Sequence, residues 1–289
     1  MTLSILLPML VSVPMQQVDE RAILKSNCPG EFKVPIIPGP RMAPMIEVEI
    51  GGKKRRMLLD TGASGGRISK KVIDELGLRP VGQSIAGDPS GKNERQVNLY
   101  RVPEVKIGGA TFYGMLTFAE EGVGPDKGLA DGVLSYAVFR DQLLTLDYPG
   151  RQIVFGPGIL PAGSASYDLE HEIPLLHVTI GDAVVPCHVD SGSDGGLMVP
   201  TKYKAKLPLD GEPRVIGHAR TLFNEIEILG VKVKSPIKFG GVSLTLPMLE
   251  MHDLFPMGNI GGRVLRKFAM TIDQKNHRIR FVEPKKEGD

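Results

Sequence analysis

Two aspartates stand in nearly the same local sequence, and that sequence could bring two carboxylates together. Asp60 lies in Met57–Gly66 and Asp190 lies in Cys187–Gly196. In both segments mainly apolar residues lead to the Asp, and Thr or Ser, Gly, a small residue and a Gly-Gly pair follow it. Paired carboxyls share one proton, so that one can act as a base towards water and the other as an acid. The two aspartates are therefore candidates for acid–base hydrolysis.

Matched blocks around the two aspartates indicate an internal duplication. Glu47–Gly51 corresponds to His177–Gly181 at the same offset of 130 residues that separates the aspartates. Leu144–Asp147 recurs as Met270–Asp273 at an offset of 126. The blocks keep their order, and the period is far longer than a solenoid repeat. We therefore predict two similar halves related by a pseudo-two-fold axis, with one aspartate from each half at that axis.

The pattern along the chain predicts a mainly β protein. Segments rich in Val, Ile and Leu alternate with Gly and Pro, which is typical of strands and turns. We assign residues 1–31 to a leader and linker, 32–160 to an N-terminal lobe and 161–289 to a C-terminal lobe. Gly156–Ser166, which is rich in Gly and Pro, is the predicted connection between the lobes.

Helix signals are few and short. The clearest is Ser69–Leu76, in which Ser69 is a predicted N-cap and Gly77 a predicted end. Short helices are also expected near Tyr136–Asp141 and Gly262–Lys267.

Charge and cysteine content argue against several classes of function. The formal net charge is +2, and the basic run Lys53–Arg56 reads as a solvated hairpin turn, so we expect no nucleic-acid partner. A disulfide between Cys28 and Cys187 is conceivable but not favoured, because two cysteines make no disulfide framework. His177, Cys187 and His188 lack the spacing of metal ligands. We therefore expect no metal and no cofactor.

The N-terminal segment Leu3–Val13 is apolar and has the length of the central part of a signal peptide. It is too short to span a bilayer, so we expect no stable membrane span. A basic segment before it and an Ala-x-Ala cleavage site after it are missing. We expect a periplasmic or secreted protein; a buried N-terminal strand would instead favour the cytoplasm.

Four segments carry a resemblance to the aspartic protease clan. Asp60–Ser64 has the form of the retropepsin signature, and Asp190–Ser193 has the form of the pepsin-type variant. Asp131–Ser135 and Asn259–Gly262 resemble the family's apolar-apolar-Gly loop. Between roughly residues 32 and 285 the chain resembles single-chain bilobal bacterial members of the clan. The resemblance implies two retropepsin-like β-barrel lobes, a monomer, and a peptide or protein substrate in the cleft between the lobes.

The resemblance also implies an aspartic endopeptidase whose dyad is Asp60 and Asp190. The hydroxyl groups of Thr61 and Ser191 would lock the two turns together across the lobe interface. Gly62 and Gly192 would let backbone N–H groups approach the carboxyls. The supporting residues are Thr61, Gly62, Ser191, Gly192 and Ser193. A Ser193 hydroxyl donating to Asp190 would favour its charged form, whereas Ala63 can offer Asp60 no such bond. We therefore expect Asp190 to be the better base and Asp60 to hold the proton.

Two hairpins are predicted as flaps over the substrate, at Ser84–Gln96 and Val215–Glu225. Each lies between a catalytic turn and a later Gly-Gly pair. The residues predicted to contact substrate are Ile85 and Gly87 in the first flap and His218 and Phe223 in the second.

Two other functions remain open at the level of sequence. One is a catalytically silent peptide- or protein-binding module on the same fold. The other is a metal-dependent hydrolase that uses the paired carboxylates. Single aspartates after strands are commonly turn formers, and we expect that role for Asp131, Asp147, Asp194 and Asp273.

Overall fold

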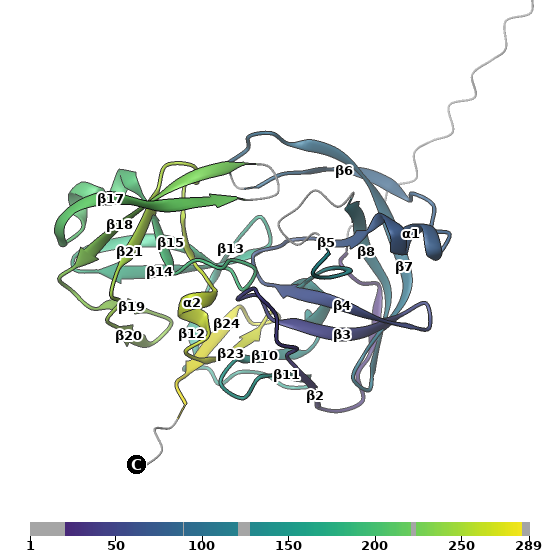
Figure 1. Cartoon of the computed structure of the whole chain (residues 1–289). Helices are drawn as coiled ribbons and strands as arrows, with labels where there is room; N and C mark the ends of the chain where they lie inside the picture. Colours follow the sequence, from purple (N-terminus) through teal and green to yellow (C-terminus); the bar gives the residue numbers. More distant parts are fainter. Residues whose placement is uncertain (1–20, 89, 121–127, 221–223, 285–289) are drawn as a thin grey trace, which may run out of the picture.

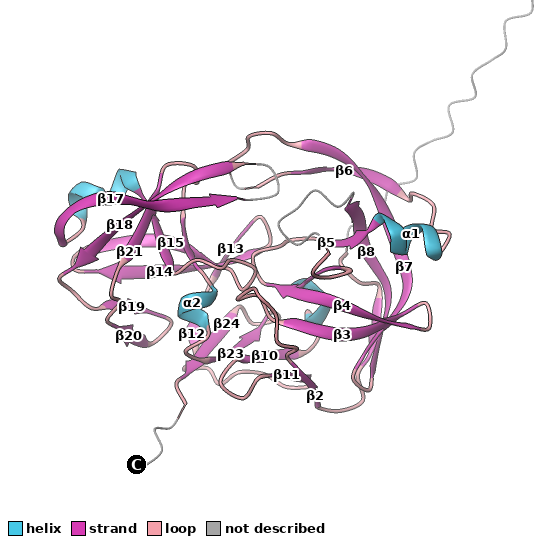
Figure 2. Cartoon of the chain, viewed as in Figure 1, coloured by secondary structure: helices cyan, strands magenta, loops and turns pink. Residues whose placement is uncertain are grey.

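The computed structural model describes residues 21–88, 90–120, 128–220 and 224–284. Strands make up 54% of the structure and helices 8%, which confirms the predicted mainly β class (Figure 2). The chain forms two lobes with a further sheet beneath their junction (Figure 1). No helix among the described residues is long and apolar enough to cross a bilayer. The predicted leader segment Leu3–Val13 lies outside the described residues.

The first lobe is a closed barrel of six strands. The ring runs β8–β5–β9–β4–β3–β7 and closes where β7 pairs with β8. Its strands, with the peripheral β1 and β6, are β1 (Lys25–Asn27), β3 (Met45–Ile50), β4 (Lys53–Asp60), β5 (Gly66–Ser69), β6 (Gly82–Ala86), β7 (Arg95–Ile107), β8 (Ala110–Glu120) and β9 (Gly132–Ser135).

Alternation along β4 directs the first aspartate out of the barrel. Met57 and Leu59 are fully buried in the main apolar core. Side chains alternate between the two faces of a strand, so Leu58 and Asp60 lie on the outer face. Leu58 packs there in a separate small cluster with Met45 and Val133. Filling the barrel with apolar side chains thus leaves the carboxyl of Asp60 outside it.

Part of the range assigned to the leader belongs to the folded lobe. The strand β1 pairs with β8, and the side chain of Ile23 is fully buried in the core. Gln142 donates a hydrogen bond of 3.0 Å to the hydroxyl of Ser26. The folded part of the first lobe therefore includes residues before 32.

The second lobe repeats the strand order of the first. Its strands are β13 (Asp168–Glu170), β14 (Ile173–Ile180), β15 (Ala183–Val189), β16 (Leu197–Pro200), β17 (Leu209–Arg220), β18 (Glu225–Val233), β19 (Ile237–Phe239), β20 (Val242–Leu244), β21 (Leu249–His252) and β22 (Gly258–Ile260). The parallel pair β15–β22 corresponds to β4–β9, and the antiparallel pair β16–β22 corresponds to β5–β9. The predicted duplication is therefore visible in the strand pairing.

The lobes differ in how the ring is completed. The first lobe uses the continuous long strands β7 and β8. In the second lobe the chain is interrupted, so that β18 and β19 take the place of β7, and β20 and β21 take the place of β8. Gly108–Gly109 and Gly240–Gly241 form the corresponding tight turns.

A six-stranded sheet joins the lobes beneath their junction. It contains β2 (Phe32–Pro35), β10 (Leu143–Asp147), β11 (Gln152–Gly156), β12 (Ala165–Ser166), β23 (Ala269–Asp273) and β24 (Arg278–Val282). At its centre β10 of the first lobe pairs antiparallel with β23 of the second, and Thr145 stands opposite Thr271. Their hydroxyls are 2.9 Å apart. Since these residues are equivalent in the two halves, the pair marks the pseudo-two-fold axis.

The helices are short and lie close to their predicted positions. α1 (Lys70–Glu75) buries Val72 and Ile73, but its N-cap Ser69 makes no side-chain capping bond, contrary to expectation. α2 (Gly262–Leu265) follows β22, and 3₁₀ turns cover Tyr136–Phe139 and Thr201–Lys206.

Candidate active site

The two aspartates face each other across the junction of the lobes. Asp60 is the last residue of β4, and Asp190 directly follows β15. A β-carbon added to Gly62 would overlap the carboxyl of Asp190, and one added to Gly192 would overlap the carboxyl of Asp60. Each carboxyl thus fills the space that the glycine of the opposite turn leaves open. Glycine is required at both positions because the other lobe's carboxyl occupies the place of a side chain.

Backbone N–H groups contact both carboxyls. The N–H of Gly62 donates to Oδ1 of Asp60 at 2.8 Å. The N–H of Ser193 donates to Oδ1 of Asp190 at 3.0 Å. A side chain adds a further donor to Asp190, since Nδ2 of Asn259 lies 2.8 Å from Oδ2 of Asp190, whereas the residue equivalent to Asn259 in the first lobe is Val133. The two halves of the site are therefore alike in backbone but not in side chains.

Thr61 and Ser191 join the two turns through four reciprocal hydrogen bonds. The Thr61 hydroxyl donates to the Val189 carbonyl at 2.6 Å and accepts from the Ser191 N–H at 2.9 Å. The Ser191 hydroxyl donates to the Leu59 carbonyl at 2.8 Å and accepts from the Thr61 N–H at 3.0 Å. Both side chains are fully buried. Each lobe thus uses one hydroxyl to hold the strand end and the turn of the other.

Ser135 stands where the family pattern has glycine, and the structure gives it a role. Its hydroxyl donates to the carbonyl of Ala63 at 2.6 Å. In the second lobe the equivalent carbonyl, that of Ser193, instead accepts from the backbone N–H of Gly262 at 2.8 Å. A side-chain hydroxyl therefore replaces a backbone donor in supporting the first turn.

The hydrogen bond that was expected to make Asp190 the better base is not formed. The Ser193 hydroxyl accepts a bond from the Gly195 N–H at 3.1 Å, and within the described residues it makes no hydrogen bond to Asp190. Burial, followed by the negative charge of Asp60, raises the pKa of Asp190 to about 7, although N–H groups of Asn259, Ser193 and Gly192 oppose the shift. The raised pKa favours the protonated form of Asp190, which runs against the expectation that Asp190 is the better base.

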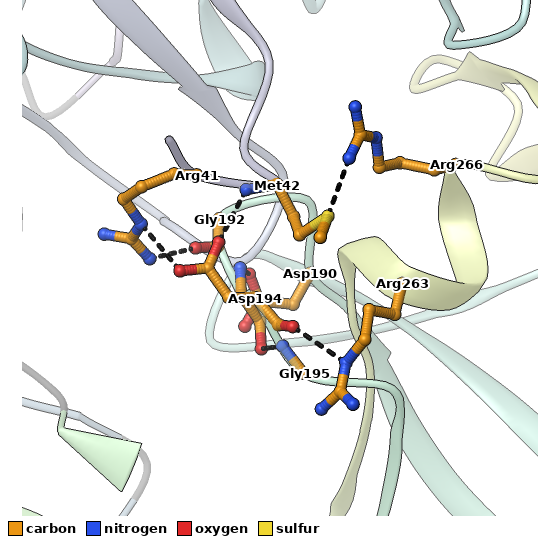
Figure 3. A network of polar contacts seen from close by, with 9 residues as sticks. Arg41, Met42, Asp190, Gly192, Asp194, Gly195, Arg263 and Arg266 are labelled. Atoms are coloured by element: carbon orange, nitrogen blue, oxygen red, sulfur yellow. Dashed lines mark hydrogen bonds and ion pairs between the residues drawn. The ribbon is translucent and has the colours of Figure 1, made fainter. Parts of the chain in front are cut away.

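A polar network holds the second turn against the segment that precedes β3 (Figure 3). Nε of Arg41 donates to Oδ2 of Asp194 at 3.0 Å, and Nη2 donates to the Gly192 carbonyl at 2.9 Å. The N–H of Met42 donates to Oδ1 of Asp194 at 2.7 Å. Asp194, expected to be only a turn former, thus connects the lobes.

The same turn is held from its other side by Arg263 of α2 (Figure 3). Nε of Arg263 donates to the Asp194 carbonyl at 3.1 Å, and its guanidinium also pairs with the buried Glu250. Glu250 in turn accepts from the Gly196 N–H at 3.1 Å. The turn after Asp190 is therefore fixed by charged side chains on two sides.

The predicted flap ranges fall on two hairpins, β6–β7 and β17–β18, that extend towards each other above the lobe junction (Figure 1). Ile85 is 69% exposed, and Gly87 and His218 are also exposed. Phe223 lies outside the described residues. Contact of these residues with a substrate stays a prediction.

The hairpin ends are hydrogen-bonded to each other. Nδ2 of Asn93 donates to Oδ1 of Asn224 at 2.7 Å. Nδ2 of Asn224 donates to Oδ2 of Asp88 at 2.8 Å and to the Ser90 hydroxyl at 3.3 Å. The two lobes are thus connected above the dyad as well as through the sheet beneath it.

The remaining candidate residues have structural contacts. Cys28 and Cys187 form no disulfide, and Cys187 is fully buried. Asp147 and Asp273 accept hydrogen bonds from backbone N–H groups three residues further along the chain, as expected of turn formers. Asp131 instead accepts from the Arg56 N–H on β4, so its contact is not a local turn. Within residues 21–284, as far as they are described, no cluster of three or more His, Cys, Asp or Glu side chains could hold a metal ion. Surface cavities of about 380 and 650 Å³ are lined by other residues, around Arg56 and Lys204.

In each β lobe one carboxyl stands at the end of a central strand, and the two carboxyls meet at the lobe junction. Residues 46–138 match the family model of aspartyl proteases. The match runs from β3 through the turn at Asp60 to the 3₁₀ turn after β9. The resemblance to aspartic proteases is thereby confirmed for this part of the chain. A comparison with curated proteins finds no match.

Sequence reasoning missed Asn259 and Arg41. Asn259 stands 126 residues after Val133, so a comparison of the two halves would have shown a polar residue opposite an apolar one. Arg41 lies in a Pro-rich segment outside the matched blocks. Its contact with Asp194 depends on how the lobes dock, which no local pattern specifies.

Proposed function

We propose that the protein is an aspartic endopeptidase that hydrolyses peptide bonds with Asp60 and Asp190. The observation that carries this proposal is the reciprocal packing of each carboxyl against the glycine of the opposite turn. Two carboxyls so placed cannot both ionise readily, and they share one proton. The aspartyl protease match of the first lobe supports the same conclusion.

In the proposed reaction, ionised Asp60 takes a proton from a water molecule while that water attacks the carbonyl carbon. Asp190, which holds the shared proton, donates it to the carbonyl oxygen. When the tetrahedral intermediate breaks its C–N bond, Asp60 gives its proton to the leaving nitrogen, and one hydroxyl of the intermediate returns a proton to Asp190 as the carbonyl re-forms. The buried hydrogen bonds of Thr61 and Ser191 hold the two turns, and with them the two carboxyls, in a fixed relative position during these proton transfers.

The pH dependence follows from the one shared proton. Because the pKa of Asp190 is raised to about 7, activity should fall as pH rises through about 7 and the dyad loses that proton. At low pH Asp60 also becomes protonated and no base remains. Activity should therefore be greatest below pH 7.

The test is cleavage of a denatured protein between pH 3 and 8, with and without pepstatin. Asp60→Asn and Asp190→Asn should each lower the rate by about 10²–10⁴-fold or more, since the acid and the base are both required. Asp147→Asn is the matched control, because Asp147 accepts from Gly150 in a remote turn. A metal chelator should have no effect.

Near-normal activity of either dyad variant would refute the mechanism. Binding of peptides by the wild-type protein, with no cleavage at any pH, would favour the silent binding module. Loss of activity in chelator would favour the metal-dependent hydrolase.

We also propose that the protein acts as a monomer, because one chain supplies both carboxyls. Sedimentation of the active form would detect an obligate dimer. A periplasmic or secreted location is proposed from the apolar segment Leu3–Val13. Cell fractionation with the segment deleted tests this, and unchanged location would refute it.

A further inference from the structure

The two lobes place different side chains beside their aspartates. On the outer face of the first lobe, Val133 of β9 stands opposite Leu58 of β4. At the equivalent place in the second lobe, Asn259 of β22 stands opposite His188 of β15. The strand pairing is the same in both lobes, so the side chains alone make the site unequal.

Asn259 reaches the carboxyl of Asp190. Its Nδ2 donates to Oδ2 of Asp190 at 2.8 Å, while the Ser193 N–H occupies Oδ1. Both oxygens of Asp190 are thereby held, which fixes the rotation of the carboxyl group. Val133, which is buried among Leu58, Met45 and Ala43, has no hydrogen-bond donor to offer Asp60.

Packing does not explain an asparagine at this position. Its Oδ1 atom is buried and has no hydrogen-bond partner. An unpaired buried amide oxygen lowers stability, and valine serves at the same place in the first lobe. The amide is therefore best explained by its bond to Asp190.

We propose that Asn259 is a positioning residue that orients the Asp190 carboxyl at the lobe junction. This inference rests on the proposed function. Asn259 does not replace either carboxyl as acid or base.

The other titratable groups around Asp190 come from several elements. Asp60 faces it from β4, and Tyr148 lies near it after β10. His188 precedes it on β15, with Nε2 at 3.3 Å from Oε2 of Glu170 on β13. Burial and the charge of Asp60 raise the pKa of Asp190, and among the groups that oppose them Asn259 contributes most.

The decisive variant is Asn259→Val, which gives the second lobe the residue of the first. Without the amide donor the charged form of Asp190 is less stable, so the upper limb of the pH–rate profile should move to higher pH by about one unit. The lower limb, which reports protonation of Asp60, should stay in place, and kcat should fall more than KM rises.

Asn276→Ala is the matched control. Nδ2 of Asn276 donates to Oδ2 of Asp273 at 2.8 Å, the same kind of bond in the same lobe but away from the dyad. The Asn276→Ala variant should leave both limbs of the pH–rate profile in place. The reciprocal variant Val133→Asn brings a donor to the first lobe and should move the lower limb to lower pH.

A measurement without turnover separates this inference from the proposed function. Carbon-13 NMR of labelled aspartate carboxyls follows the titration of Asp190, identified by its loss in Asp190→Asn. The apparent pKa should rise in Asn259→Val, and Asn259→Ala should repeat the result if the valine variant folds poorly. An unchanged or lowered value would overturn the role of Asn259. A raised value in a protein that cleaves nothing would uphold it while the proposed function fails.

Discussion

Removing the Thr61 hydroxyl should weaken the junction of the lobes more than the small change in side chain suggests. Thr61→Val keeps the shape of the side chain and deletes one oxygen atom. That oxygen donates to the Val189 carbonyl at 2.6 Å and accepts from the Ser191 N–H at 2.9 Å. All of these atoms lie in a fully buried region, since Thr61 and Ser191 have no exposed surface.

The magnitude follows from the two backbone groups that lose this partner. Each buried polar group left unpaired lowers stability by about 1–3 kcal/mol. Two such groups give roughly 4 kcal/mol, which corresponds to a fall in melting temperature of about 8–16 °C for a protein of this size. The bond from the Thr61 N–H to the Ser191 hydroxyl remains, so the fold should persist with a weakened junction.

The assay is urea unfolding together with calorimetry on the wild type, Thr61→Val and a control. Thr145→Val is the control because Thr145 also bonds across the lobes, but through one hydroxyl pair at 2.9 Å. It should lose only about 1 kcal/mol. A loss below about 1 kcal/mol for Thr61→Val, or equal losses for both variants, would refute the reasoning.

Two further contacts between the lobes give predictions of the same kind. Arg41→Ala removes the donors to Asp194 and Gly192. Amide hydrogen exchange should become faster in the turn after Asp190 and stay the same in the turn after Asp60. Unchanged exchange in residues 190–196 would show that α2 alone holds this turn. Asn224→Ala removes the bonds between the hairpin ends, and exchange of β6 and β17 should increase; equal protection in the variant would show that the hairpins are held from elsewhere.

The duplication could be predicted because the constraints on each lobe are local. A strand that fills a barrel on one face and ends at a carboxyl needs apolar residues, then Asp, then a turn with glycine, and both halves meet this need in nearly the same residues. The same argument located the two hairpins, the turns at Asp147 and Asp273, and the helix α1. The order of strands then follows in both lobes from the repeated blocks.

Other features depended on the docking of the lobes. The sequence shows glycines at 62 and 192, but only the docked structure shows that each leaves room for the other lobe's carboxyl. The Ser193 hydroxyl has the right chemistry to donate to Asp190, yet it accepts from Gly195, and Asn259 supplies the donor from 69 residues further along the chain.

What the sequence by itself determined is therefore the pair of carboxylates, the repeated mainly β lobes and the residue types that each turn requires. What only the tertiary structure decided is the hydrogen bond from Asn259 to Asp190 and the contacts of Arg41 and Asp194. The physical reason is that strand and turn preferences act over a few residues, whereas the pKa of a buried carboxyl depends on burial and on charges from distant segments. Asp60 and Asp190 have almost the same neighbours in the chain, but they have different neighbours in space.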